Sequence, residues 1–250
     1  MSRSAEKEKL DDLSLSGEPL HQALQSLAWI NKWFGNHRAV TSSVLSVYKA
    51  QPKRVRITDL GCGGGDLVLA VAKALQQKHI PFSITGIDGN ANALAYAQQQ
   101  CAAFADVQFV QADILADNFT IPPCDILISS HFVYHFTDHQ LTGFLGNNLL
   151  HINRALIFSE LERNRLAMIL FKALGYLLPI SKLARADGLL AIKRAFTKKE
   201  WLLILQKANI GSFRLKRVPL FRIQLIIFKP GETATGKLPY IKPNNPVDLI

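Results

Sequence analysis

The sequence predicts an α/β protein with a doubly wound, seven-stranded, mostly parallel sheet, an N-terminal helical cap and a helical insertion before the last helix. The first observation is a glycine-rich loop that joins an apolar strand, residues 55–60, to an apolar helical pattern beginning near residue 66. The second is that helical patterns alternate with further strand-like segments, which is typical of parallel sheets. These segments lie near residues 83–88, 107–111, 124–130 and 154–160.

The remaining elements follow from apolar periodicity and capping signals. Residues 19–50 carry a helical pattern, interrupted at Gly35-Asn36, that we expect to cover the site. Residues 163–192 carry another, which we expect to form a helical lid. Thr197 and Glu200 fit the N-cap and N3 positions of a capping box for the last helix. Two final strands, the last one antiparallel, complete the sheet near residues 213–218 and 221–228.

Length and composition indicate one folding unit. The chain has 250 residues, of which 48% are hydrophobic, so one large domain over residues 19–230 is the natural count. Residues 1–18 are charged and polar, and we expect them to be flexible. Residues 231–250 are rich in Gly, Pro, Lys and Asn and are expected to form a loose tail.

The glycine loop reads Asp59-Leu-Gly-Cys-Gly-Gly-Gly65. A dinucleotide fingerprint, G-x-G-x-x-G counted from Gly61, would require glycine where Asp66 stands. A carboxylate at a helix N-terminus disfavours a phosphate ligand there. No Gly-Lys-Ser/Thr follows, which excludes a P-loop. The loop therefore indicates a nucleoside-type ligand without a phosphate at this point.

Acidic residues end three successive predicted strands: Asp59, Asp88 and Asp113. In a doubly wound sheet, a carboxylate at the end of the second strand is placed to accept hydrogen bonds from ribose hydroxyls. The repetition is more specific than any one acid, because an ordinary apolar core has no reason to repeat it.

The D-x-G-x-G-x-G pattern resembles motif I of the class I S-adenosylmethionine-dependent methyltransferases, which implies a Rossmann-like methyltransferase fold. Their cofactor carries a sulfonium, an ammonium and a carboxylate but no phosphate, so an acid beside the loop is compatible with it. In that family the counterpart of Asp113 contacts the adenine amino group, and the apolar residue after it, here Ile114, packs on the ring. The resemblance implies this set of residues for S-adenosyl-L-methionine binding: Asp59, Gly61, Gly63, Gly65, Asp88, Gly89, Asp113, Ile114 and Ser130.

The end of the fourth strand bears on the methyl acceptor. Enzymes that methylate base amino groups carry Asn/Asp-Pro-Pro-aromatic there, whereas this chain reads Ser129-Ser-His-Phe132. The segment resembles the small-molecule branch of the family, including quinone-biosynthesis and aromatic O-methyltransferases. We expect methyl transfer to the phenolic oxygen of a small apolar aromatic molecule. The alternatives are C-methylation of a quinone-like ring, and a non-catalytic protein that binds the cofactor or RNA.

Three histidines follow the fourth strand at a spacing of four: His131, His135 and His139. On one helix they would share a face and could bind a metal ion. However, His131 is expected at a strand end, and no Cys or Glu completes the set, so we expect no metal. One or two of them could instead cap the helix or face solvent. We take His135 and His131 as candidate catalytic bases, because a neutral histidine near the acceptor could remove a phenolic proton.

A narrower resemblance rests on Arg185-Ala-Asp-Gly188 and Arg194-Ala-Phe-Thr197, which are similar to bacterial methyltransferases that accompany type III polyketide synthases. It implies a role in secondary metabolism. We expect Phe132, Phe171 and Tyr176 to line the acceptor pocket, with ordinary helix packing or a dimer surface as the alternative for residues 163–192.

The charge distribution and the cysteine content limit the binding partners and the cell compartment to be expected. From residue 193 onward, 12 Lys and Arg stand against three acids, and this basic part could bind nucleic acid or touch an anionic membrane. Because the basic residues alternate with apolar ones, as in half-buried strands, we do not expect nucleic acid. Weak contact with a membrane surface stays open, and no obligate protein partner is evident. The three unpaired cysteines and the lack of a signal peptide or membrane helix favour a cytoplasmic protein.

Overall fold

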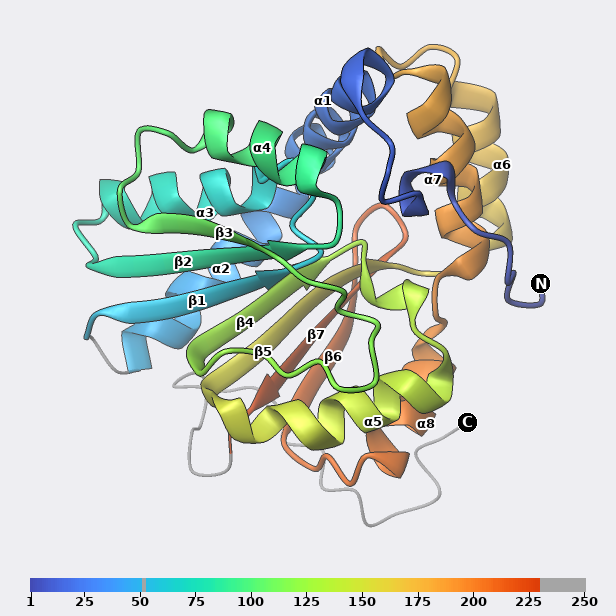
Figure 1. Cartoon of the computed structure of the whole chain (residues 1–250). Helices are drawn as coiled ribbons and strands as arrows, with labels where there is room; N and C mark the ends of the chain where they lie inside the picture. The colour runs from blue at the N-terminus through green and yellow to red at the C-terminus, as the bar shows by residue number, and fades with distance from the viewer. Residues whose placement is uncertain (51–52, 230–250) are drawn as a thin grey trace.

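A computed structural model describes residues 1–50 and 53–229. Its centre is a seven-stranded sheet with the order β3-β2-β1-β4-β5-β7-β6 (Figure 1). Neighbouring strands from β3 to β5 are parallel, whereas β7 runs antiparallel to β5 and to β6. The predicted sheet, including its antiparallel last strand, is confirmed. The strands are β1 Val55–Leu60, β2 Phe82–Asp88, β3 Val107–Gln111, β4 Cys124–Ser130, β5 Ile152–Leu161, β6 Phe213–Val218 and β7 Arg222–Phe228.

Eight α-helices and three short 3-10 helices (η) connect and flank the described strands. The predicted capping box begins the last helix: Glu200 N–H donates to Thr197 Oγ1, and Thr197 N–H donates to the Glu200 carboxylate. The helices are α1 Gly17–Trp33, α2 Asn36–Ala50, α3 Asp66–Gln77, α4 Ala91–Gln100, α5 Asp138–Asn148, α6 Arg165–Leu174, α7 Lys182–Arg194 and α8 Lys198–Lys207, with η1 Lys9–Asp11, η2 Val133–His135 and η3 Leu149–His151.

The core consists of two apolar layers, one on each face of the sheet. Strand residues alternate between them: Leu156 of β5 belongs to the cluster formed with α5 and α8, and the next residue, Ile157, to the cluster formed with α2 and α3. The side chain of Trp201 on α8 is fully buried in the first cluster. With both faces covered, the ligand crevice of such a sheet lies at the carboxyl ends of the parallel strands.

The helices that the sequence assigned to a cap and a lid gather at that end of the sheet, as Figure 1 shows for α1, α6 and α7. α1 and α2 meet at Gly35, a residue with φ of 76°, and only α1 lies at that end, because α2 packs on the face of the sheet beside α3. Residues 163–192 form α6 and most of α7. α7 is tied to α1, because Ser181 N–H donates to Ser26 Oγ over 2.9 Å. The predicted tail, residues 231–250, lies outside the described residues.

Candidate functional site

The glycine loop between β1 and α3 is held open by left-handed backbone. Gly61, Gly63 and Gly65 have φ of 66°, 49° and 73°, a region that favours glycine. The N–H of Gly61 donates to Ile87 O of β2 over 2.9 Å. A Cβ atom at Gly61 would lie 2.3 Å from the ring of Phe132, so this ring lies directly against the loop. The structure therefore brings the predicted cofactor loop and a predicted acceptor residue into contact.

Asp88 lies at the end of β2, beside the loop. Its Oδ2 accepts from Gly63 N–H and its Oδ1 from Asn90 N–H, both over 2.9 Å. A carboxylate offers about four acceptor positions, so each oxygen keeps one for a ligand hydroxyl. Burial raises the pKa of Asp88, and the hydrogen bonds from the backbone N–H groups of Asn90 and Gly63 oppose that rise.

Asp59, at the end of β1, is 2% exposed, and its Oδ2 has no hydrogen-bond partner among the described residues. Burial raises the pKa of Asp59 well above its usual value, and the carboxylates of Asp66 and Asp88 add to the effect. An unpaired buried oxygen is costly. Its position under the glycine loop is where a bound cation, such as a ligand ammonium, would stabilise it.

Asp66 is the first residue of α3, and its carboxylate is already bound. Asn31 Nδ2 donates to Asp66 Oδ2 over 2.9 Å, and His37 Nε2 lies 2.6 Å from the same oxygen. Burial would raise the pKa of Asp66, but these contacts lower it below its usual value. The start of α3 is therefore occupied by a carboxylate, which disfavours a phosphate and is compatible with S-adenosylmethionine. Sequence reasoning missed Asn31 and His37, which approach from the cap.

The other predicted cofactor residues differ in exposure. Asp113 is exposed beyond β3, and its Oδ1 accepts from Leu115 N–H over 3.0 Å, while Ile114 is 4% exposed. Ser130 is bonded within the protein: Asn36 Nδ2 donates to its Oγ over 2.6 Å, and Ser130 Oγ donates to Ser159 O over 3.1 Å.

A residue from the N-terminal segment lies over Gly89. A Cβ atom at Gly89 would lie 2.9 Å from Leu13, and Asn90 Nδ2 donates to the Leu15 carbonyl over 3.1 Å. The segment before α1 therefore reaches the predicted ribose and adenine positions at the end of β2.

The three histidines do not lie on one helix. His131 follows β4 with a left-handed φ of 55°, His135 ends η2, and His139 is an exposed residue of α5. The extended backbone at Phe136 separates η2 from α5. The stacked arrangement considered from the spacing is therefore wrong. Burial, together with the nearby guanidinium of Arg222, lowers the pKa of His131 to about 4.

His135 forms a pair with a carboxylate that the sequence did not predict. Its Nδ1 lies 3.2 Å from Asp11 Oδ1, and its ring contacts that of Phe132 in a tilted arrangement, with a centroid distance of 5.4 Å. Burial opposes ionisation of Asp11, but hydrogen bonds from His135 and Arg194 lower its pKa to about 2. Glu8 is 8% exposed beside them, and burial raises its pKa to about 8.

Glu8, Asp11 and His135 lie close enough together to hold a metal ion. A cation is already in place, because Arg194 Nη1 lies 2.7 Å from Asp11 and 3.4 Å from Glu8. The guanidinium supplies the charge that a metal would supply, so this cluster gives no support for a metal.

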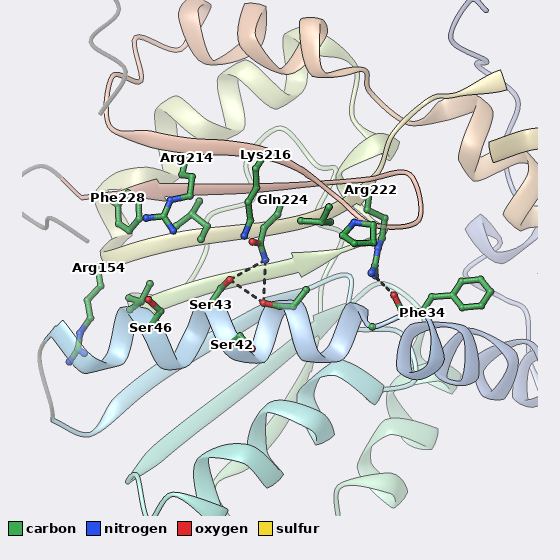
Figure 2. Close-up of a pocket in the computed structure, with 16 residues that line it drawn as sticks. Phe34, Ser42, Ser43, Ser46, Arg154, Arg214, Lys216, Arg222, Gln224 and Phe228 are labelled. Atoms are coloured by element: carbon green, nitrogen blue, oxygen red, sulfur yellow. Dashed lines mark hydrogen bonds between the residues drawn. The ribbon is translucent and has the colours of Figure 1, made fainter. Parts of the chain in front are cut away.

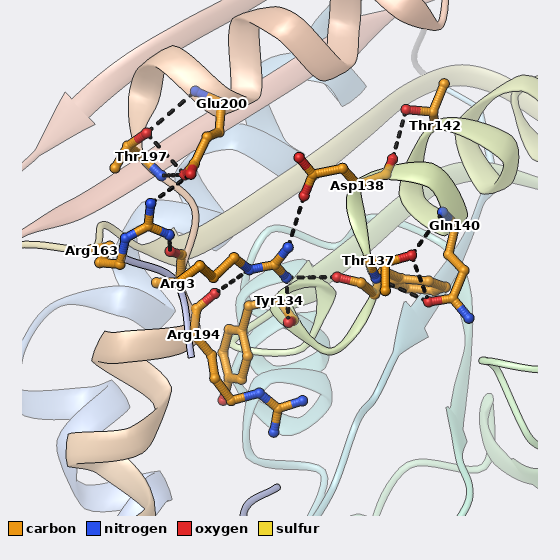
Figure 3. Close-up of polar contacts among 12 residues, drawn as sticks. Arg3, Tyr134, Thr137, Asp138, Gln140, Thr142, Arg163, Arg194, Thr197 and Glu200 are labelled. Atoms are coloured by element: carbon orange, nitrogen blue, oxygen red, sulfur yellow. Dashed lines mark hydrogen bonds and ion pairs between the residues drawn. The ribbon is translucent and has the colours of Figure 1, made fainter. Parts of the chain in front are cut away.

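The segment that carries Asp11 is anchored by Arg3, as Figure 3 shows. The guanidinium donates to the carbonyls of Tyr134, Phe136 and Arg194 over 2.8, 2.6 and 2.7 Å and pairs with Asp138. The expectation that residues 1–18 are flexible is therefore corrected: the segment is bonded to the loop after β4 and to α7. Most of its polar residues are exposed, and a few of them, such as Arg3, Glu8 and Asp11, make these contacts.

The structure does not bring the whole predicted acceptor set together. Phe171 of α6 is half-buried, and its ring fills the space beside Gly188 of α7, where a Cβ would lie 2.8 Å away. Tyr176 is 73% exposed, with the guanidinium of Arg185 4.4 Å above its ring. The placement of Tyr176 in a pocket is corrected, because this side chain stacks on the surface. Of the expected acceptor residues, Phe132 is the one that contacts the glycine loop.

Comparison with known proteins supports the same class. Residues 57–151 match the family described as "Methyltransferase domain". No curated protein matches the chain in sequence.

Among solved structures, the plantazolicin methyltransferase BamL, in complex with a triazolic desmethylPZN analogue and S-adenosylhomocysteine, aligns with a TM-score of 0.57 at 14% identity, covering 84% of this chain and 96% of that one. Human N-acetylserotonin methyltransferase with bound S-adenosylmethionine aligns with a TM-score of 0.56 at 17% identity, covering 88% of this chain. The magnesium protoporphyrin IX methyltransferase of Synechocystis PCC 6803, with S-adenosylhomocysteine, aligns with a TM-score of 0.53 at 16% identity, covering 88% and 92%. This chain spans 61% of the human protein.

The glycine loop, the acid at the end of β2 and the methyltransferase-domain match over residues 57–151 define the class. Residues 57–151 thus carry a methyltransferase domain, and the described chain has the Rossmann-like fold of the class I S-adenosylmethionine-dependent methyltransferases. None of the described helices is long and apolar enough to cross a membrane.

Proposed function

We propose that this methyltransferase transfers the methyl group to the phenolic oxygen of a small apolar aromatic molecule. The observation that carries the proposal is that Phe132 packs against the glycine loop and His135 lies beside Phe132, with ring centroids 5.4 Å apart. An aromatic surface and a basic nitrogen thus adjoin the position expected for the transferring methyl. Acceptor pockets are commonly apolar with a few placed polar groups.

The predicted cofactor residues have separate roles in this proposal. Asp88 accepts hydrogen bonds from the ribose through its two remaining acceptor positions. The unpaired carboxylate oxygen of Asp59 faces the ammonium group of S-adenosylmethionine. The backbone of Gly61, Gly63 and Gly65 permits close approach of the ligand. The remaining members of the set are Gly89, Asp113 and Ile114 beside the adenine, and Ser130 at the end of β4.

The bound cofactor supplies a methyl group that is already activated by its sulfonium. This chain's residues mainly align the acceptor and exclude water, and positioning of this kind can supply about 7–11 kcal/mol of a barrier. A base that takes the phenolic proton adds a smaller contribution, typically 10²–10⁴-fold in rate.

His135 is the better candidate for that base. Asp11, 3.2 Å from its Nδ1, favours the tautomer that keeps the proton there and leaves Nε2 free to accept one. His131 stays the weaker candidate, because burial and Arg222 lower its pKa to about 4. A group that holds protons so poorly gives little driving force for proton removal at neutral pH.

The test is a transfer assay with S-adenosylmethionine labelled in its methyl group, against a panel of phenols, quinones, fatty acids and RNA. A phenol that yields a methyl ether supports the proposal, whereas a ring-methylated quinone favours C-methylation. Salt-dependent RNA binding without transfer to any small molecule would favour the non-catalytic alternative.

The catalytic assignment is tested by His135→Ala and His135→Gln, with His139→Ala on the exposed face of α5 as the matched control. Both His135 variants should keep affinity for S-adenosylhomocysteine, and their transfer rate should fall at least tenfold. Normal transfer by both His135 variants would remove this residue from the mechanism.

We also propose weak contact between α6 and an anionic membrane surface. Three leucines and an isoleucine lie on one face of α6 and the turn after it, and they are 40–80% exposed: Leu166, Ile169, Leu170 and Leu177. The exposed Arg165 and Lys172 lie on the same helix. An amphipathic helix with basic neighbours binds such surfaces. Flotation with phosphatidylglycerol vesicles, and its loss in Leu166→Ser/Ile169→Ser, tests this contact, and equal flotation of the variant contradicts it.

A further inference from the structure

A groove of about 420 Å³ lies between α2 and the strands β6 and β7, on the face of the sheet opposite α5 and α8 (Figure 2). Its strand side is built by the period of two along each strand: Arg214 and Lys216 on β6, and Arg222 and Gln224 on β7. Its helix side presents the serines at positions 42, 43 and 46 of α2. The volume is within the usual range of small-molecule pockets, roughly 300–1,000 Å³.

The charge of this groove is one-sided. Arg154, Arg214, Lys216 and Arg222 line it, and none of the lining residues that the structure describes is acidic. Figure 2 shows the ends of Lys216 and Gln224 converging above Ser43, whose Oγ accepts from Gln224 Nε2 over 3.0 Å. Low-dielectric walls that carry one sign of charge concentrate ions of the opposite sign.

Arg222 is the strongest indication of a missing partner. The residue is 4% exposed, its Nε has no hydrogen-bond partner among the described residues, and its Nη2 donates to the Phe34 carbonyl. Other arginines in the same part of the fold have carboxylates: Arg217, on the opposite face of β6, pairs with Glu162 over 2.7 Å, and Arg163 pairs with Glu200. Arg222 makes no such pair with any described residue. A buried charge without a counter-ion is costly, and an anion bound in the groove would offset that cost.

The apolar lining defines the rest of the ligand. Phe34, Val47, Ile226 and Phe228 lie along the groove between and beyond the charged groups. We propose that the groove is a second ligand site that binds a small organic anion, an apolar chain or ring that carries a phosphate or carboxylate group. None of the residues of the glycine loop lines the groove, although Arg222 at its end is near His131, and the proposal does not depend on the acceptor assigned above.

Isothermal titration calorimetry on the full-length protein tests the site with four probes: octyl phosphate, octanoate, 1-octanol and inorganic phosphate, each in the presence of saturating S-adenosylhomocysteine. We expect octyl phosphate or octanoate to bind at least tenfold more tightly than 1-octanol or inorganic phosphate. The comparison of the two organic anions identifies the preferred head group. Tighter or equal binding of 1-octanol would overturn the proposal, because it would leave the basic residues without a role.

Charge reversal localises the binding. Lys216→Glu changes an exposed strand residue and should weaken binding of the preferred anion at least tenfold. Lys207→Glu, an exposed residue of α8 over the opposite face, makes the same change in net charge and should leave binding unchanged. Equal losses in the two variants would mean a general charge effect and overturn the site. Anion binding that is seen without S-adenosylhomocysteine but is lost when S-adenosylhomocysteine is saturating would place the anion at the cofactor loop and also overturn the proposed site. Arg222→Gln, if folded by circular dichroism, should abolish the preference for the anion.

Discussion

Replacement of Asp88 by Asn tests the assignment of the cofactor edge. Each oxygen of this carboxylate accepts one backbone N–H, from Gly63 and Asn90, and keeps one position for a ribose hydroxyl. The amide of Asn retains a single acceptor oxygen, so one ligand hydrogen bond to a charged group is lost. Such bonds contribute about 1.5–3 kcal/mol, which corresponds to a roughly 10- to 150-fold loss of affinity.

The assay is calorimetry with S-adenosylhomocysteine at pH 7.5, with Asp125→Asn as the matched control. Asp125 lies at the amino end of β4, where it accepts from Arg56 N–H over 2.8 Å and from Asn153 Nδ2 over 2.9 Å. Asp125→Asn should reduce the free energy of unfolding and change the affinity for S-adenosylhomocysteine less than twofold, because the ligand crevice lies at the carboxyl ends of the strands. Equal losses of affinity at the two positions would refute the reasoning. The affinity of the wild-type protein should also fall at acidic pH, since burial raises the pKa of Asp88 and only its ionised form is a full acceptor.

Three further predictions concern stability, each measured by urea unfolding. Burial raises the pKa of Glu160 from 4.5 to about 8, because the folded protein favours its protonated form. The free energy of unfolding is therefore highest below pH 4.5, and it falls as the pH rises from there through about 8. Glu160→Gln should flatten this loss, which is at most about 5 kcal/mol, and an unchanged pH profile would contradict it. Arg3→Ala should cost about 1–3 kcal/mol and expose the N-terminal segment to protease, because buried carbonyls lose their donor; resistance equal to wild type would mean that the anchor is unimportant. Gly86→Ala should destabilise by about 1–3 kcal/mol, because its Cβ would lie 2.6 Å from Phe109. The control Gly143→Ala, in α5 with nothing within 4 Å, should stabilise by up to about 1 kcal/mol, and the reverse order would contradict the packing.

The segments predicted well from the sequence are those in which the signal is local. The run from β1 through the glycine loop into α3 follows from adjacent residues, since the apolar period, the misplaced third glycine and Asp66 all lie within 12 positions, residues 55–66. The capping box at Thr197 and Glu200 is local for the same reason. The strand ends at Asp59 and Asp88 could be placed because parallel strands finish at one edge of the sheet.

The contacts that complete the candidate site could not be predicted in this way. These contacts join elements far apart in the chain, so no residue spacing in the sequence predicts them. They are the Asp11–His135 pair and the contacts of Asn31 and His37 with Asp66. The N-terminal segment illustrates the point, since a polar composition is shared by free tails and by segments whose polar groups are bonded elsewhere.

Sequence alone determined the fold class and the cofactor class, because glycine placement and strand periodicity act over a few residues. The tertiary structure decided which histidine has a carboxylate partner, that Tyr176 lies on the surface, and that Arg222 is buried without a counter-ion. The burial of Arg222 depends on the order β4-β5-β7-β6 and on the packing of α2, whereas the other two outcomes depend on where the N-terminal segment and α6 lie. That packing is set by the summed burial of many apolar side chains, and no single stretch of the sequence contains it.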